Sequence, residues 1–438
     1  MQHKRCVQWH RSKVFVFILC SLGLSTSLLG QNGASDPLFA RVPFQQWLAE
    51  GPRQQIPWKV ILWPERLSSH QRLLSYVEIL LSGKVLAERP GQGRLVALVQ
   101  FTDGTGRVYQ NDGSVQVEGV NPGVKNPGLK EKDAYFAWGA FVLPGDYKVT
   151  LALYDRETGE HNLLQRNLRV APLKNDPLPD AWRDLPNVEF MERAEKADSS
   201  YHPEIHGRLH LPLATQRPVQ IEVLVNLTPS EILTGSYRAY NFNLRALIPI
   251  LKTLSQMDVP NGIINLATLD LTRQQVSFEQ SAVNANQLDW SHLREAVAAA
   301  DPNTIDVHSL QDRKYNAAFL RDELARRIAL HSEDQAGDPV RVFILLTSPV
   351  AFTAHNGLSQ IELPRECNCL IYHVRYNWWL SRMAAFDDID KVLKPLRLRK
   401  FSASSPLQVR KALATMLAEI SKAGSASGKE GLAANEQE

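Results

Sequence analysis

The spacing of hydrophobic positions changes near residue 218. Between residues 73 and 171 the apolar residues form six short runs rich in Val, Leu, Tyr and Phe, with turn residues such as Gly, Asn, Asp and Pro between them. Short strands at about ten-residue spacing, separated by turn residues, are typical of an antiparallel β-sandwich. No helical period interrupts this stretch. The pattern therefore predicts a β-sandwich domain over 73–171.

From residue 217 to 422 strand-like and helix-like segments alternate. Three apolar runs, VQIEVLVNL at 219–227, GIINLATLDL at 262–271 and VRVFILLT at 340–347, are typical of buried strands. Helical spacing of leucines follows the first run, and a capping box at Ser405–Gln408 begins a last helix. This alternation predicts a doubly wound α/β domain, Rossmann-like in its layering, over 217–422.

The remaining segments lack a regular period. Residues 31–72 are expected to be an N-terminal extension and 423–438 a disordered tail. Residues 172–216 are rich in Pro, which predicts an extended connector lying across the surface, with a short helix near Glu189–Lys196.

The composition is that of a globular protein of two or three domains. The chain has 438 residues, of which 44% are hydrophobic and 22% charged, which excludes a disordered chain, a coiled coil and a disulfide-dense scaffold. Lys plus Arg is 49 against 46 for Asp plus Glu, and four of these basic residues precede Asp36. The remainder of the chain has 45 basic and 46 acidic residues, so its formal charge is close to zero. The charge therefore gives no support to a nucleic-acid partner.

The N-terminus has the layout of a secretory signal peptide. A basic stretch is followed by the uncharged run 14–30, and small residues surround 25–34. We expect residues 1–30 to be a signal peptide cleaved within 27–34, and the protein to be exported to the periplasm, the cell surface or the medium. An uncleaved membrane anchor is the alternative. We expect no membrane contact other than through the signal peptide or this anchor.

Two cysteines, Cys367 and Cys369, remain after such cleavage. A Cys-x-Cys pair closes only a small, strained ring. We therefore expect two free thiols entering a buried strand, with a redox pair as the alternative.

No catalytic motif occurs in a convincing context. The chain lacks a phosphate-binding loop, a dinucleotide-binding fingerprint and a nucleophile elbow. His202, Glu204, His206 and His210 fall on one face of an extended segment, an arrangement that suits zinc but is more often solvated. We therefore expect a protein that is not an enzyme, with an exported hydrolase without recognisable motifs as an alternative.

Two further clusters are candidates for contacts. Trp378 and Trp379 are adjacent, so both cannot face one core, and one of them is a candidate interface anchor. The second cluster is predicted to be a solvated helix face. It contains Arg321, Arg326 and Arg327 together with Asp322 and Glu323.

The order of elements over 218–422 resembles that of a von Willebrand factor type A (vWA) domain. IEVLVNLTPS matches the first strand and loop, IINLATLD the second strand, VRVFILLTSP the fourth, and LRLRKFSASSPLQVRKALATMLAEI the closing segment. VLPGDYKVTLALYDRETGE, which ends the sandwich, resembles immunoglobulin-like modules of exported bacterial proteins. The whole chain is similar to the secreted bacterial VWFA-related proteins, of acidobacterial type.

The resemblance implies a metal-ion-dependent adhesion site (MIDAS) with an Asp-x-Ser-x-Ser loop after the first strand. Here Asn226 replaces the carboxylate, while Thr228 and Ser230 keep the hydroxyls, and Thr347 begins a loop that lacks the expected Asp. Magnesium needs anionic oxygen ligands, so a degenerate site without metal or other cofactor is expected. The resemblance then implies a protein-binding scaffold with an unidentified protein partner. A Mg²⁺- or Mn²⁺-dependent adhesion domain, with Asp270, Asp306 or Asp312 as substitute ligands, is the alternative.

Overall fold

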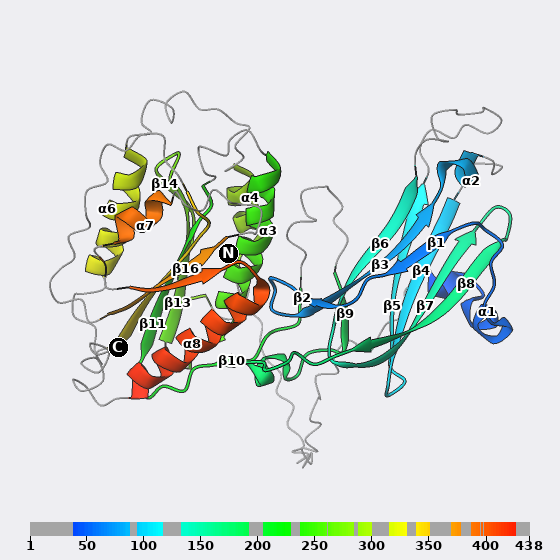
Figure 1. The fold of residues 1–438 in the computed structure, drawn as a ribbon, viewed down its shortest axis with the longest axis horizontal. Coiled ribbons are helices and arrows are strands. Elements are labelled where there is room, and N and C mark those ends of the chain that lie inside the picture. The colour runs from blue at the N-terminus through cyan, green and yellow to red at the C-terminus, as the bar shows by residue number, and fades with distance from the viewer. Residues whose placement is uncertain are drawn as a thin grey trace, which may run out of the picture. The chain divides into compact units, whose positions relative to one another are not determined.

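The computed structural model describes residues 38–87, 94–116, 133–191, 205–228, 237–260, 262–283, 288–299, 315–330, 339–350, 369–377, 387–394, 396 and 398–425. We call 38–191 the β block and 205–425 the α/β block; both lie within the single unit 35–438. The fold is mixed, with antiparallel sheets in the first block and a mixed sheet in the second (Figure 1).

Two antiparallel sheets in the β block share one core. The first has the order β1 (Lys59–Leu62), β3 (Leu73–Leu81), β6 (Ala134–Val142) and β9 (Val188–Phe190), with β2 (Arg66–Leu67) also paired to β3. The second has the order β5 (Val108–Gln116), β4 (Arg94–Asp103), β7 (Gly145–Asp155) and β8 (His161–Val170). Alternate residues of both sheets, such as Val77 of β3 and Val99 of β4, are fully buried in a common cluster.

Short helices accompany these sheets. The helix α1 (Phe44–Glu50), preceded by the 3₁₀ turn η1 (Phe39–Arg41), covers the outer side of the second sheet, where Trp47 stacks on His161 at 4.5 Å between ring centroids. A second helix, α2 (Gly83–Ala87), follows β3. The sequence shows no helical period at this place, because a helix of five residues is too short to leave one.

The α/β block is built on a six-stranded sheet. Its order is β14 (Gln275–Gln280), β13 (Gly262–Asp270), β11 (Val219–Asn226), β15 (Val340–Thr347), β16 (Cys369–Tyr376) and β17 (Arg399–Ala403). All neighbours are parallel except β14, which runs antiparallel at one edge. The chain order reverses between β11 and β15, and loops after these two strands therefore leave on opposite faces at a switch point.

Helices cover both faces of this sheet (Figure 1). One face packs on α3 (Tyr237–Leu254), α4 (Trp290–Ala299) and α8 (Pro406–Ser425). The other packs on α6 (Asn316–Leu330) and α7 (Asp388–Leu393). The helix α8 runs to Ser425, three residues into the segment expected to be a disordered tail.

The segment 172–216 is more deeply integrated than a surface connector. It contains the 3₁₀ turn η3 (Pro179–Trp182) and the strand β10 (Leu211–Pro212), which pairs with β12 (Met257–Asp258). The segment contributes five buried residues to the core of the α/β block: Ala181, Leu185, Leu209, Leu211 and Leu213. Residues 188–190 form β9 and not the start of a helix. The burial of these apolar residues was not predicted, because the prolines interrupt the regular spacing of apolar residues that would indicate a buried strand or helix.

Several predictions fall on residues outside the described ranges. These are the signal peptide at 1–30, His202, Glu204, Ser230, Asp306, Asp312, Cys367, Trp378, Trp379 and the tail from 426. Cys369 is disulfide-bonded, so the expectation of a free thiol is wrong for this residue. None of the helices in the described part of the chain has the length and apolarity needed to cross a bilayer.

Candidate functional site

The candidate site lies where β11 and β15 end. Val225 of β11 pairs with Leu346 of β15, so Asn226 and Thr347 follow side by side at the carboxyl edge of the sheet. Both side chains are 0% exposed, and Thr228 is buried as well. The structure therefore brings together three of the four predicted site residues, but beneath the surface.

The amide of Asn226 has a defined orientation. Its Oδ1 accepts a hydrogen bond from the backbone N–H of Thr228 at 3.1 Å. Its Nδ2 is buried, and no residue in the described ranges accepts a hydrogen bond from it. The end of β11 thus presents an N–H donor at the position where a cation ligand would need to present an oxygen.

Thr228 holds the loop after β11 against the end of β13. Its Oγ1 accepts a hydrogen bond from the backbone N–H of Leu271 at 2.6 Å, and the N–H of Leu227 donates to the carbonyl of Leu269 at 3.0 Å. The hydroxyl that the resemblance assigns to a metal ion is therefore engaged in tying two strands together.

Thr347 contacts a buried histidine on the neighbouring strand. Its Oγ1 lies 2.9 Å from Nε2 of His373, whose Nδ1 lies 3.5 Å from Oδ1 of Asp390 in α7. Burial lowers the pKa of His373 to about 4, so the imidazole is neutral near pH 7. A hydroxyl, an imidazole and a carboxylate in this order are also the parts of a nucleophile–base relay. Thr347 and His373 are at most 1% exposed, however, so a substrate cannot reach them in this conformation.

Asp387 fixes the start of α7 beside this relay. Its Oδ1 accepts hydrogen bonds from the backbone N–H groups of Val350 and Ile389, both at 3.2 Å, which makes it the N-cap of the helix. Arg375 forms an ion pair with its Oδ2 at 2.7 Å. Burial nevertheless outweighs these contacts and raises the pKa of Asp387 to about 6.

The described carboxylate at this edge is already bound within the chain. Asp270, the one described substitute carboxylate, is bound by the backbone and side chain of Arg273, with Nη1 to Oδ2 at 2.7 Å. Within the described ranges, no group of three or more His, Cys, Asp or Glu side chains could hold a metal ion. Of the predicted zinc cluster, His206 and His210 are described. The backbone N–H of His206 donates to Oε1 of Glu189 at 2.6 Å, and Nε2 of His210 lies 3.4 Å from a guanidinium nitrogen of Arg183.

Sequence reasoning missed a charge network farther down the sheet. Arg327 of α6 donates through Nε to Oε1 of Glu323 at 2.6 Å and through Nη1 to Glu222 of β11. All three residues are buried, so the prediction of a solvated face is wrong for Glu323 and Arg327. Burial opposes the charge on Arg327, but the carboxylates outweigh it and raise its pKa.

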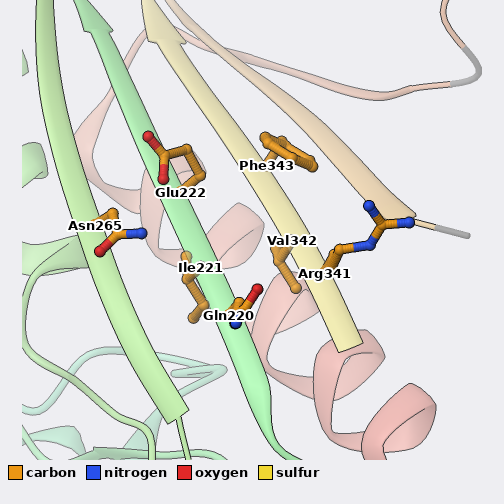
Figure 2. A pocket seen from close by; sticks show the side chains of 7 residues that line it. All are labelled: Gln220, Ile221, Glu222, Asn265, Arg341, Val342 and Phe343. Carbon is orange, nitrogen blue, oxygen red and sulfur yellow. The ribbon is translucent and has the colours of Figure 1, made fainter. Parts of the chain in front are cut away.

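A small pocket adjoins this network. Polar and aromatic side chains from three neighbouring strands line it, and Figure 2 shows them on one stretch of the sheet: Gln220, Glu222, Asn265, Arg341 and Phe343. The sequence carries a signal for this site, because Glu222 lies within a mostly apolar strand and a buried carboxylate requires a partner.

Comparisons with known proteins do not identify a family. No protein-family model and no curated protein matches the sequence. The PilB minor pilin from Streptococcus sanguinis is 9% identical over 77% of this chain and 91% of the pilin, with a TM-score of 0.27. The ArnB paralog VWA2 from Sulfolobus acidocaldarius is 8% identical over 62% of this chain and 49% of that protein, with a TM-score of 0.25. The pilus adhesin SpaC from Lactobacillus rhamnosus GG is 10% identical over 66% of this chain and 34% of the adhesin, with a TM-score of 0.27. These are weak structural neighbours.

Proposed function

We propose that this chain is an exported, non-enzymatic protein-binding scaffold. In this proposal the β block is an immunoglobulin-like sandwich, and the α/β block is a vWA-type domain whose adhesion site works without a metal ion. The strand order β14-β13-β11-β15-β16-β17 supports the proposal, because its switch point lies at the ends of β11 and β15, where ligands bind in such sheets.

The observation that carries the proposal is the orientation of the Asn226 amide. Its oxygen is already bound by the loop, and its nitrogen is a buried donor. A cation next to this N–H would meet a positive pole, whereas a carbonyl or carboxylate oxygen of a partner would be accepted. The proposed edge is therefore specific for an oxygen acceptor, and Asn226, which is 0% exposed, must become accessible for a partner to bind it.

A thermal melt with and without metal tests this proposal. We expect the unfolding midpoint of the purified chain to be the same in EDTA and in millimolar Mg²⁺ or Mn²⁺. The Asn226→Asp variant should melt lower in EDTA, because a buried carboxylate then has the backbone N–H of Thr228 and no cation to balance its charge, and it should recover when Mg²⁺ is added. A metal ion present at a concentration of a hundred times its dissociation constant would stabilise the folded state by about 2.7 kcal/mol.

One result would contradict the metal-free site, and another would contradict its relation to a metal-binding scaffold. A rise of the wild-type midpoint in Mg²⁺ that Thr228→Ala abolishes would show a working adhesion site. Failure of Asn226→Asp to respond to any concentration of Mg²⁺ would show that the edge is unrelated to a metal-binding scaffold.

Partner binding is tested separately with the Asn226→Leu variant, which removes the donor at similar volume. Wild-type and variant chains, immobilised after circular dichroism has verified their fold, are exposed to a cell-envelope extract, and bound proteins are identified by mass spectrometry. The proposal expects a protein that the wild type retains and the variant loses. Equal retention by both would place the contact away from this edge.

A further inference from the structure

The first antiparallel sheet ends at β1, whose outer edge is unpaired in the described part of the chain. The backbone N–H of Trp63 donates to the carbonyl of Tyr76 at 2.9 Å, so in this register Ile61 and Trp63 direct their backbone groups toward β3. Val60 and Leu62 direct theirs to the other side, where no described residue bonds to them. Two N–H donors and two carbonyl acceptors are therefore available to a further strand.

The side chains of β1 divide between the two faces of the sheet. Val60 and Leu62 pack against the core of the β block. Lys59, Ile61 and Trp63 alternate with them and lie along the outer face. Lys59 is exposed, Ile61 is half-buried and Trp63 is 40% exposed. An added strand would therefore lie beside a cation, an aliphatic side chain and an aromatic ring, in that order.

A second copy of the same strand complements this order. When two β1 strands run antiparallel with Ile61 at the two-fold axis, Val60 of each copy lies opposite Leu62 of the other, and these pairs exchange backbone hydrogen bonds. Lys59 of each copy then lies opposite Trp63 of the other, where an ammonium group and an indole ring attract each other. A lysine on an edge strand usually opposes pairing, but in this register it meets a ring and no like charge.

The residues that flank β1 limit the contact to this short strand. Pro57 and Pro64 lack a backbone N–H and bound the segment that can pair. The charged residues Glu65 and Arg66 lie beyond Pro64, outside the paired segment. Oε1 of Glu65 also accepts a hydrogen bond from the backbone N–H of Ala171 at 3.2 Å, so this carboxylate is held by its own chain.

We propose that two copies of the chain form a symmetric dimer by pairing their β1 strands. The first sheets of the two copies then become one continuous sheet across the axis. A strand of four residues gives a contact smaller than that of a permanent dimer, so the dimer should dissociate on dilution.

Size-exclusion chromatography with light scattering, at rising concentrations of the purified chain, tests the proposal. We expect the mass to rise from that of one copy to that of two. Ile61→Lys places two like charges opposite each other at the axis and should raise the dissociation constant roughly tenfold or more. Within each copy the new charge lies opposite Glu78 of β3, which favours the folded chain. Val108→Lys, which changes a 40% exposed apolar residue at the start of β5, is the matched control and should leave association unchanged.

An exchange of charge tests the position of the axis. Ile61→Glu alone should also fail to dimerise, whereas an equal mixture of Ile61→Lys and Ile61→Glu should dimerise, because unlike charges then meet at the axis. Circular dichroism verifies the fold of each variant. A wild-type mass of one copy at every concentration would overturn the proposal. Association of Ile61→Lys equal to that of the wild type, or a mixture that stays monomeric, would overturn it as well.

Discussion

The charge on Arg327 is stabilised by carboxylates on three different elements. Glu323 lies one turn earlier in α6, Glu222 lies on β11 within the sheet, and Glu279 lies on the edge strand β14. Arg327, Glu323 and Glu222 are buried, whereas Glu279 is half exposed. The neighbouring Arg326 also binds Glu323 but keeps 49% of its side chain exposed. Two adjacent arginines of one helix therefore share a partner and differ in burial.

This difference predicts unequal effects of the same substitution. Arg327→Met should lower the free energy of unfolding by about 3–5 kcal/mol, because it leaves a buried carboxylate without its partner. Arg326→Met should cost only about 0–1 kcal/mol, as expected for a solvated ion pair. Urea denaturation of both variants measures the difference. Similar losses would mean that the Glu222–Arg327 contact contributes no more than a surface pair.

The helix α7 is held by two groups whose pKa values shift in opposite directions. Asp387, its N-cap, has a pKa raised to about 6 by burial, with Asp390 raising it further against the effect of Arg375. His373, which faces α7 from β16, has a pKa lowered to about 4 by burial and by Lys400 and Arg375, against the effect of Asp390. Both groups therefore titrate within one acidic window.

The signs of the two contributions differ. Folding favours protonated Asp387, so its contribution is present below about pH 4 and is lost as the pH rises through about 6. Folding favours neutral His373, so its contribution is present above about pH 6.5 and is lost as the pH falls through about 4. Relative to wild type, Asp387→Asn should gain stability as the pH rises from 4 to 6, and His373→Gln should lose it, by at most about 3 kcal/mol each. Denaturation at several pH values measures both slopes, and parallel slopes would contradict the assignment.

At the scale of elements, local chemistry decided what the sequence could predict. Strands of the β block were predictable because turn residues bound each one, and the start of α8 was predictable from its capping residues. The strand β9 was not, because Val188–Phe190 is only three residues long and lies between prolines. The burial of Arg327 was not predictable either, because it depends on which strand lies beneath α6.

At the scale of the whole molecule, Arg410 of α8 connects distant parts of the chain, and its side chain is fully buried. Its guanidinium donates to both carboxylate oxygens of Asp176 at 2.5 and 2.8 Å, to the carbonyl of Leu178 at 2.7 Å and to the carbonyl of Gln71 at 3.3 Å. It also lies 4.7 Å from the ring centroid of Trp182. Gln71 precedes β3, so one side chain connects the β block, the segment 172–182 and the last helix.

We therefore expect Arg410→Met to uncouple the two blocks. Asp176 would lose its partner, and the free energy of unfolding should fall by about 3 kcal/mol or more. The single unfolding transition should also separate into two when tryptophan fluorescence and far-UV circular dichroism are compared. Lys411→Met, at the exposed neighbouring position, is the control and should keep one transition. Coincident transitions in Arg410→Met would show that the blocks are coupled through other contacts.

The candidate site could be predicted from the sequence only in part. Its place at the ends of β11 and β15 was implied by the resemblance of IEVLVNLTPS and VRVFILLTSP to the strands and loops of a vWA domain. The direction of the Asn226 amide could not, since it depends on the backbone of Thr228 two residues later. The sequence therefore suggested where a site could lie. That Asn226 presents an N–H donor there could be seen only in the folded loop.

The contacts of Arg410 also set an order of events. Gln71 and Asp176 lie 339 and 234 positions before the arginine that they bind. A chain made from its N-terminus can complete its antiparallel sheets while α8 has not yet been synthesised. During that interval the carboxylate of Asp176 and the carbonyl of Gln71 must be hydrated. The final step of maturation is then the removal of this water when the last helix arrives, so a chain that stops before residue 410 would keep an open, wet seam where the finished protein has a closed one.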